Sequence, residues 1–223
     1  MEPNKRNPTR LDTLPDDMLR VIISKVGAAS SSDYANTVLS CRSMNFGLDD
    51  PLIATTLCIS PLVEQPRLAD NYGKLMEQLL AADNLAAHYV KGIREYFLFD
   101  NQSLGLHHLR IASNGSHREA TYLYGLLRMA LGMVDEGKKI ISELSEDVGV
   151  ASVEKIWVKV QKSISDLPLR LKDEYVATYM KMKPDVNCHP AEVDTVCSGC
   201  FHAYLMYEFF DMVIGLNPVS ATA

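Results

Sequence analysis

The sequence has no excess of positive charge and no long apolar run. Its 22 Lys and Arg stand against 28 Asp and Glu, a formal charge of −6, whereas nucleic-acid-binding proteins usually carry a basic excess. Even the apolar stretch from Ala203 to Leu216 is interrupted by Glu208 and Asp211, so it falls short of the ~20 uninterrupted residues of a membrane helix. We therefore expect binding to neither nucleic acid nor a membrane.

Cysteine is scarce and odd in number. The five cysteines are Cys41, Cys58, Cys188, Cys197 and Cys200. The first residues carry charge but no apolar core of a secretory signal. The thiols are therefore expected to be reduced or to bind metal, rather than to form a disulfide framework, in a cytoplasmic or nuclear protein.

Motifs of catalysis are also missing. There is no Gly-x-Ser-x-Gly, no glycine-rich loop ending in Lys-Ser or Lys-Thr, and no His-Glu-x-x-His. The adjacent His107 and His108 would point about 100° apart on a helix, so they cannot readily chelate one metal. The acidic run at Glu143, Glu146 and Asp147 is typical of a solvated helix end. With no nucleophile placed near a base, the sequence predicts a protein that is not an enzyme.

What is present is helical periodicity along nearly the whole chain, in an ordinary globular composition of 47% hydrophobic and 22% charged residues. The predicted fold class is all-α. We divide the chain into a flexible tail at 1–13, a first helical unit at 14–60, a helical region at 67–183 and a Cys/His segment at 184–223. A proline-punctuated joint, from Ser60-Pro61 to Gln65-Pro66, separates the first unit from the helical region.

The first unit is predicted to form three short helices. Leu14-Pro15-Asp16-Asp17 marks the first start, because proline suits a first-turn position and the carboxylates suit the positive end of the helix dipole. Gly27 could supply the left-handed residue that ends this helix. Ser30 to Ser32 offer caps for a second helix, and Asp49-Asp50-Pro51 marks a third. So small a unit buries little surface, which leaves apolar surface for a partner.

Leu-Pro-Asp-Asp-x-Leu at 14–19, together with Val38-Leu39-Ser40-Cys41-Arg42 and then Phe46, resembles an F-box. The resemblance implies a three-helix module that docks on the Skp adaptor of an SCF ubiquitin ligase, while the rest of the chain selects a protein substrate. It assigns adaptor binding to apolar residues along the first two helices: Leu14, Pro15, Met18, Leu19, Ile22, Ile23, Val26, Tyr34, Val38 and Cys41. We expect Leu14, Pro15, Leu19, Ile22 and Ile23 to form an interface rather than a closed core.

The helical region contains an internal repeat. Ala87-His88-Tyr89-Val90-Lys91-Gly92 recurs 33 residues later as Ala120-Thr121-Tyr122-Leu123-Tyr124-Gly125. A helical period in the thirties indicates stacked helix pairs, and Asn114-Gly115 is expected to stop the helix between the copies. The glycines at 92 and 125 predict close helix approach. Packing in the core is the favoured role for four tyrosines: Tyr89, Tyr96, Tyr122 and Tyr124.

The string from Gly105 to Gly125 resembles the Sel-like branch of the tetratricopeptide-type repeats, which are protein-binding scaffolds. Glu136 to Glu146 and Val153 to Ile164 are expected to be further, degenerate helices. An F-box followed by such helices and a cysteine-rich tail resembles a plant-type F-box family.

The tail gathers Cys188-His189, Cys197-Ser198-Gly199-Cys200 and His202. Cys-x-x-Cys lets two thiolates reach one zinc, so Cys188, Cys197 and Cys200 with either histidine are candidate ligands. With a single such pair, we favour reduced structural cysteines and no cofactor. A closing helix from Phe201 to Leu216 is expected to turn five residues inward: Tyr204, Leu205, Phe209, Met212 and Val213.

Three functional hypotheses remain open. The first is a non-enzymatic substrate receptor of an SCF-type ubiquitin ligase. The second is a free-standing helical scaffold whose first helices merely cap the repeats, and the third is a small structural zinc protein. An apolar face that is covered within the monomer would favour the second hypothesis, and an open one the first.

Overall fold

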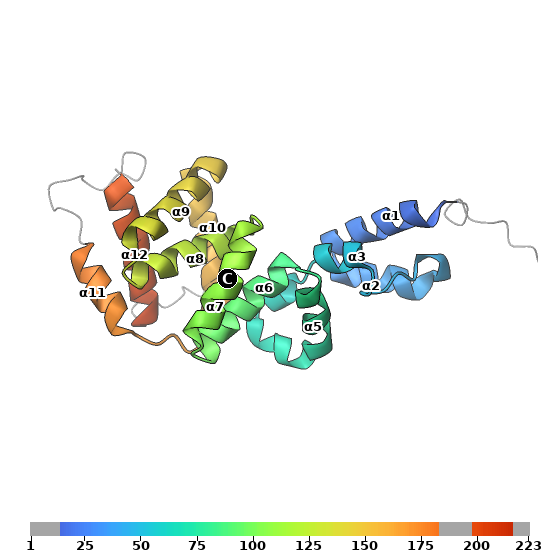
Figure 1. The fold of residues 1–223 in the computed structure, drawn as a ribbon, viewed down its shortest axis with the longest axis horizontal. Helices are drawn as coiled ribbons and strands as arrows, with labels where there is room; N and C mark the ends of the chain where they lie inside the picture. The colour runs from blue at the N-terminus through green and yellow to red at the C-terminus, as the bar shows by residue number, and fades with distance from the viewer. Residues whose placement is uncertain (1–13, 183–197, 216–223) are drawn as a thin grey trace, which may run out of the picture.

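The structure is a computed structural model that describes residues 14–182 and 198–215. Within these residues the chain forms helices and no strand, which confirms the predicted all-α class. The molecule is elongated, with the first helices at one end and the last at the other (Figure 1). None of the helices in this part of the chain has the length and apolarity needed to cross a membrane.

The helices follow one another closely along the chain. The first unit and the segment behind it contain α1 Asp16–Ala29, α2 Ser31–Ser40, the 3₁₀ helix η2 Arg42–Met44, α3 Pro51–Thr56, α4 Ser60–Glu64 and the 3₁₀ helix η3 Pro66–Tyr72. The rest comprises α5 Gly73–Ala81, α6 Leu85–Ile93, the π-helix η4 Arg94–Leu98, α7 Gln102–Asn114, α8 Arg118–Ala130, α9 Val134–Val148, α10 Val150–Ile164, α11 Asp173–Lys181 and α12 Ser198–Val213.

The first unit consists of α1, α2 and α3, and each predicted helix start is present. Ser30 caps α2 by accepting a hydrogen bond from the Asp33 N–H at 3.1 Å, and Asp50 caps α3 by accepting from the Leu52 N–H at 3.0 Å. A small core lies between the helices, formed by Leu19, Ile23, Met44 and Ile53.

Gly27 does not end α1, contrary to expectation. The helix continues to Ala29, and Ser30 leaves it with extended backbone. Gly27 is buried instead, and a Cβ there would lie 3.2 Å from the Leu57 side chain. The Gly27 carbonyl also accepts a hydrogen bond from the Cys58 N–H at 2.9 Å. The glycine is therefore needed for close packing, which local turn chemistry does not reveal.

A second core joins the first unit to the repeats. It runs from α3 to α6 and contains Ala54, Leu57, Ile59, Leu62, Ala69, Met76, Leu79, Ala87 and Val90. The proline-rich joint forms α4 and the start of η3 within this core. Asn84 is 2% exposed and spans the boundary, because its Nδ2 donates to the Ala54 and Leu57 carbonyls at 2.8 and 3.0 Å.

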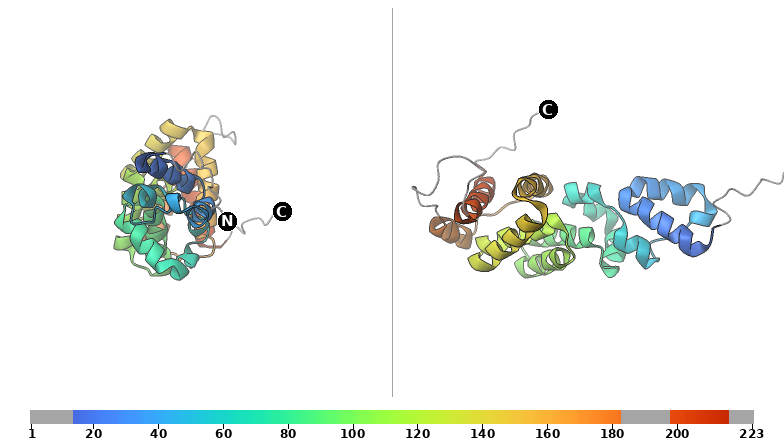
Figure 2. Two further views of the ribbon diagram at one scale, coloured as in Figure 1. Left: turned by 90° about the vertical axis from the view of Figure 1, so that its right-hand side faces the viewer. Right: turned by 90° about the horizontal axis from the view of Figure 1, so that it is seen from above.

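The repeats are the antiparallel pairs α6–α7 and α8–α9, and α10 packs against α8 and α9 (Figure 2). Close approach at the repeat glycines is confirmed. A Cβ on Gly92 would lie 2.8 Å from Leu109 Cγ, and one on Gly125 would lie 3.0 Å from Ile141 Cγ1. The facing helices carry glycines too, since a Cβ on Gly105 would meet the Tyr96 backbone at 2.8 Å. Helices α9 and α10 are the degenerate helices expected from the sequence.

One turn geometry recurs between the repeat helices. Asp83, Ser116 and Gly132 have positive φ, and the residue after each donates its N–H to a carbonyl five residues earlier, at 2.9–3.0 Å. Each left-handed residue also donates its own N–H to a carbonyl three residues earlier, at 2.9–3.1 Å, and the two bonds together form the Schellman motif. The helix does stop after Asn114, but the left-handed residue is Ser116 rather than Gly115. Gly115 makes room for Leu85, whose Cδ2 would lie 2.3 Å from a Cβ at that position.

Helix α6 ends in the π-helix η4, where the Phe99 N–H donates to the Arg94 carbonyl at 3.0 Å. A π-turn fits one more residue into a helix than α geometry allows. The turn that follows is correspondingly wider, because the Asn101 N–H reaches back to the Glu95 carbonyl at 2.7 Å.

The largest core spans the repeats and the last helices. All four tyrosines predicted as core residues are buried in it. Helix α12 packs against α8 and α11 (Figure 1), and four of its five predicted inward residues are buried: Leu205, Phe209, Met212 and Val213. Tyr204 is the exception at 51% exposed. It precedes Leu205 by one position, or about 100°, and so falls outside the buried stripe.

Candidate protein-binding surfaces

The residues assigned to adaptor binding divide between the core and the surface of the first unit. Leu19 and Ile23 are 2% and 0% exposed in the small core, so the expectation that they form an interface rather than a closed core is wrong. Their spacing of four residues places both on the face of α1 that α3 and η2 cover. Leu14, Tyr34 and Cys41 pack partly against the same core.

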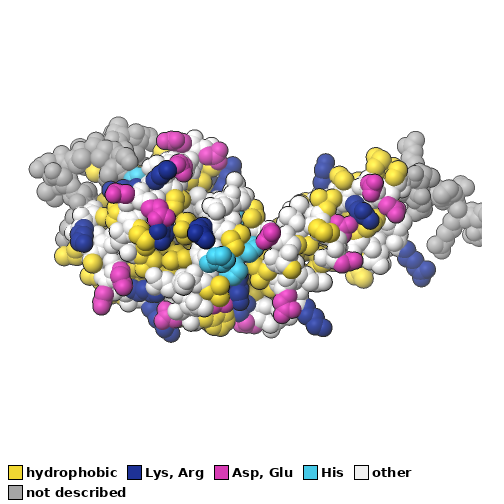
Figure 3. Space-filling view, viewed as in Figure 1, with side chains coloured by type: hydrophobic (Ala, Val, Ile, Leu, Met, Phe, Trp, Pro, Cys, Tyr) yellow, Lys and Arg dark blue, Asp and Glu magenta, His cyan; other side chains and the backbone are white. Residues whose placement is uncertain are grey.

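The remaining assigned residues lie further out. Pro15 and Met18 are exposed, with Met18 at 53%, while Ile22, Val26 and Val38 are half-buried. Three exposed residues were missing from the assignment, namely Val21, Leu39 and Leu52. Leu39 is 85% exposed. It sits on the flank of α2 that the apolar pattern leaves outside, which is the signal that could have identified it. Hydrophobic side chains are visible on this unit in Figure 3.

Polar contacts hold the three helices in place beneath this surface. Arg20 on α1 pairs with Asp50 at 3.1 Å and lies over the Phe46 ring at 5.6 Å. The Tyr34 hydroxyl donates to the Phe46 carbonyl at 2.8 Å. Burial, followed by the carboxylates of Asp49 and Asp50, raises the pKa of Tyr34, so the hydroxyl stays a donor. The exposed apolar residues therefore stand on a fixed support.

A cleft of about 350 Å³ lies at the surface between the first unit and the repeats. Its lining includes Cys58, His117 and Glu119. His117 Nδ1 accepts the Ala120 N–H at 3.3 Å, and burial lowers its pKa, so the ring remains a neutral cap of α8. Glu119 pairs with Lys159 at 3.2 Å. His117 and Glu119 thus serve the structure of the repeats.

Histidines gather on the repeat face visible in Figure 3. His88 Nδ1 and His108 Nδ1 are 2.9 Å apart, and His107 lies against the His108 ring. Burial is the first cause that lowers the pKa of both His88 and His108, and for His108 the value falls to about 4. Two nitrogens this close can share one proton only if at least one ring is neutral. The pair therefore links α6 to α7 as a neutral hydrogen bond.

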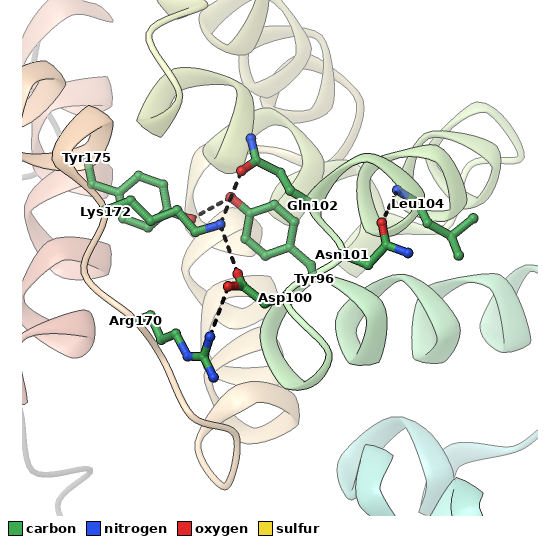
Figure 4. Close-up of polar contacts among 8 residues, drawn as sticks. All are labelled: Tyr96, Asp100, Asn101, Gln102, Leu104, Arg170, Lys172 and Tyr175. Atoms are coloured by element: carbon green, nitrogen blue, oxygen red, sulfur yellow. Dashed lines mark hydrogen bonds and ion pairs between the residues drawn. The ribbon is translucent and has the colours of Figure 1, made fainter.

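A polar junction fastens the segment before α11 to the end of the first repeat helix (Figure 4). Asp100 accepts from Arg170 at 2.9 Å and from Lys172 at 3.4 Å, and Lys172 also donates to Gln102 at 3.1 Å. Beneath it the hydroxyls of Tyr96 and Tyr175 are 2.5 Å apart, and burial raises the pKa of both. The junction fixes where α11 and α12 stand relative to the repeats.

The candidate zinc ligands are only partly described. Cys188, His189 and Cys197 lie outside the described residues, whereas Cys200 and His202 lie on α12. His202 is 1% exposed, with its Nε2 3.3 Å from Ser142 Oγ on α9. Within residues 14–182 and 198–215, no three side chains are grouped so that they could bind a metal. The zinc hypothesis stays untested.

Comparison with known proteins agrees with this arrangement. The family described as plant tetratrico peptide repeats matches residues 63–165. F-box protein At2g35280 of Arabidopsis thaliana is 40% identical over 144 residues, which cover 65% of this chain and 88% of that protein. Putative F-box protein At1g67623 of the same plant is 32% identical over 122 residues, 55% of this chain and 41% of its own length.

More distantly, F-box protein At1g67340 of Arabidopsis thaliana is 23% identical over 121 residues, 53% of this chain and 32% of its own length. The chain thus spans less than half of the last two relatives. No solved structure matches it. With a three-helix unit at one end, repeats of the matched kind behind it and a relative covered almost completely, the chain belongs to the plant F-box proteins that carry tetratrico-type helical repeats.

Proposed function

We propose that this protein is a substrate-receptor subunit of an SCF-type ubiquitin ligase. In this role it is not an enzyme: the first unit binds the Skp adaptor, and the helices behind it hold a protein target. The observation that carries the proposal is the set of exposed apolar residues on the first unit, led by Leu39 and Met18. Exposed aliphatic side chains on a rigid support are typical of an interface. Such a protein works in the cytoplasm or nucleus.

The corrected assignment changes which residues should bind the adaptor. Met18, Val21 and Leu39 are free to meet a partner, while Leu19 and Ile23 support the helix from inside. Truncating the buried pair would therefore unfold the first unit and say nothing about binding. The binding test also needs the full-length chain, because Asn84, which lies beyond the first unit, bonds to the Ala54 and Leu57 carbonyls.

The test uses the full-length chain and purified Skp adaptor in a pull-down. We expect Met18→Glu combined with Leu39→Glu to lose adaptor capture by about tenfold or more, because two charges would enter an apolar interface. The melting temperature should barely change, since both side chains are exposed. Val158→Glu, at a position 62% exposed on α10, is the matched control and should capture adaptor normally. Undiminished capture by the double variant would show that this surface does not bind the adaptor.

A second function, a free-standing repeat scaffold without adaptor, is favoured by one observation. The central part of the α1 apolar face is covered within the monomer by Met44 and Ile53, as a capping role requires. The same pull-down separates the two functions, because a scaffold of this kind would not capture the adaptor even as the unaltered chain.

A further inference from the structure

The last two helices expose an aromatic surface that the repeats do not explain. The Tyr179 ring on α11 stacks on Phe210 of α12 with centroids 4.3 Å apart and planes 11° apart. The Tyr207 ring lies 5.5 Å from Tyr179. Val176 and Tyr204 lie three positions before Tyr179 and Tyr207 on the same helices, and Met180 lies four positions after Val176. These spacings bring side chains together on a helix surface. We name these six residues the α11–α12 face.

Three large side chains of this face are exposed. Met180, Tyr204 and Tyr207 are 59%, 51% and 49% exposed, whereas the tyrosines of the repeats are buried. Terminal elements of a repeat array normally turn a polar side to solvent, which keeps the array soluble. Tyrosine, with an apolar ring and a polar tip, is enriched where proteins meet partners. The face also lies beyond residues 63–165, so the matched repeat family does not account for it.

The charged groups that act on the tyrosines of this face are carboxylates, although Lys181 ends α11 next to Met180. Burial and then the carboxylates of Glu208 and Glu154 raise the pKa of Tyr204. For Tyr179, burial raises the pKa first, followed by the neighbouring Tyr207 and by Asp211. Carboxylates on α10 and α12 thus stand beside the exposed rings. Rings flanked by carboxylates form a surface that favours cations.

We propose that the α11–α12 face binds a basic segment, rich in Arg or Lys, of the target protein. The inference rests on the proposed receptor function and places part of its target site. Elsewhere in this chain, cations already lie over rings: Lys172 is 4.9 Å from the Tyr96 centroid and Arg94 is 5.5 Å from that of Phe99. A target arginine would lie over Tyr207 or Tyr204 in the same way and pair with Glu208 or Asp211.

Two other occupants fit the charge less well. The linking segment 183–197 carries Lys183 against Asp185, Glu192 and Asp194, so it is acidic and would be repelled. A second copy of the chain carries a formal charge of −6 and would bring the same acidic face to the contact. Like charges brought together at an interface disfavour both.

The experiment measures binding of two fluorescein-labelled peptides to the full-length chain by anisotropy, at physiological salt. One peptide alternates arginine with leucine, and the other has glutamate in place of arginine. We expect the arginine peptide to bind about tenfold or more tightly, and Tyr207→Ser combined with Asp211→Asn to remove most of that preference. Tyr72→Ser combined with Glu146→Gln removes an exposed ring and an exposed carboxylate elsewhere, and it should bind like the unaltered chain.

Several results would overturn the inference. Equal binding of the two peptides would do so, as would an equal loss in the control variant. Tighter peptide binding after residues 185–194 are replaced by a glycine-serine linker of equal length would show that the linking segment occupies the face. A dimer in sedimentation that Tyr207→Ser dissolves would assign the face to a second copy. Adaptor capture is measured on the same variants, so that a failure of the receptor function is seen separately.

Discussion

At the scale of single residues, the neutral His88–His108 pair makes stability depend on pH. The pKa of each histidine is lower in the folded chain than the ordinary 6.5. Between about pH 6.5 and 4 the unfolded chain binds more protons than the folded chain does. The stability that depends on the neutral pair is therefore fully present above about pH 6.5 and is lost as pH falls toward about 4. We expect the free energy of unfolding, measured by urea denaturation, to decrease through this window.

Variants attribute the effect to the pair. Replacing His108 with Gln keeps a hydrogen-bonding side chain but removes a titrating group, so the unfolding free energy should vary less between about pH 6.5 and 4. His107→Gln removes the exposed histidine beside the pair and leaves the pair itself, so most of the pH dependence should remain. If the two variants keep the same pH dependence as the unaltered chain, other titrating groups cause it.

At the scale of elements, glycines set how closely the helices of a repeat approach. A Cβ on Gly137 would lie 2.5 Å from the Gly125 carbonyl oxygen and 2.7 Å from the Met129 backbone nitrogen. Because these backbone atoms cannot move aside, the added methyl group should cost about 1–3 kcal/mol of packing energy. This cost exceeds the ~1 kcal/mol that alanine gains in helix propensity, so we expect Gly137→Ala to lower the free energy of unfolding. Gly125→Ala meets only isoleucine side chains, at 3.0–3.1 Å, and should lose less.

Gly73 provides the control for these glycine variants. It has helical backbone angles and no neighbouring atom within 4 Å of the added Cβ, so Gly73→Ala should not destabilise. Urea denaturation of the three variants gives the order. A stability of Gly137→Ala equal to that of the unaltered chain would show that α8 and α9 separate without penalty.

The elements themselves were largely predictable from the sequence, because their signals are local. Pro15 and Asp50 mark helix starts, and the 33-residue period identified the repeat glycines. The left-handed turn residue was not predictable at Ser116, since Asn114-Gly115 offers the stronger turn signal and the true reason for Gly115 is its distant neighbour Leu85. The π-helix also has no distinctive residue pattern, because it depends on the fit of α6 between its neighbours.

The candidate binding residues were predicted less well, for a physical reason. A helical apolar stripe shows that residues face one side, but it cannot show whether the chain itself or a partner covers that side. Leu19 and Met18 are adjacent in sequence, yet one is in the core and the other at the surface. The α11–α12 face was missed in the same way, since the helical pattern of the closing helix placed Tyr204 inward.

At the scale of the whole molecule, Asn84 links the first unit to the repeats. It donates to two carbonyls of the first unit and accepts the Ala87 N–H at 3.1 Å as the cap of α6. Asn84→Ala leaves these buried groups unpaired, so we expect a loss on the order of 2–4 kcal/mol. The first unit should then melt before the repeats, which differential scanning calorimetry would show as a second transition.

Asn101→Ala is the matched control for this loss. Asn101 caps α7 by accepting from the Leu104 N–H at 3.4 Å, but it is exposed, so only about 1 kcal/mol should be lost. Fluorescence of the single tryptophan, Trp157 in the repeat core, follows the repeats alone. Coincident melting of both units in Asn84→Ala would show that the second core couples them without the asparagine.

The π-helix η4 accommodates one extra residue in the first helix of the first repeat, compared with the first helix of the second repeat. The left-handed residues Asp83 and Asp100 bracket a first helix that is one residue longer than the helix bracketed by Ser116 and Gly132. A regular α-helix with that extra residue would rotate everything after it by about 100°. The widened turn at 94–98 absorbs the residue instead. The second helix of each repeat therefore meets its first helix in the same way despite the extra residue, since a Cβ on Gly105 and one on Gly137 would each lie against the backbone of the preceding helix.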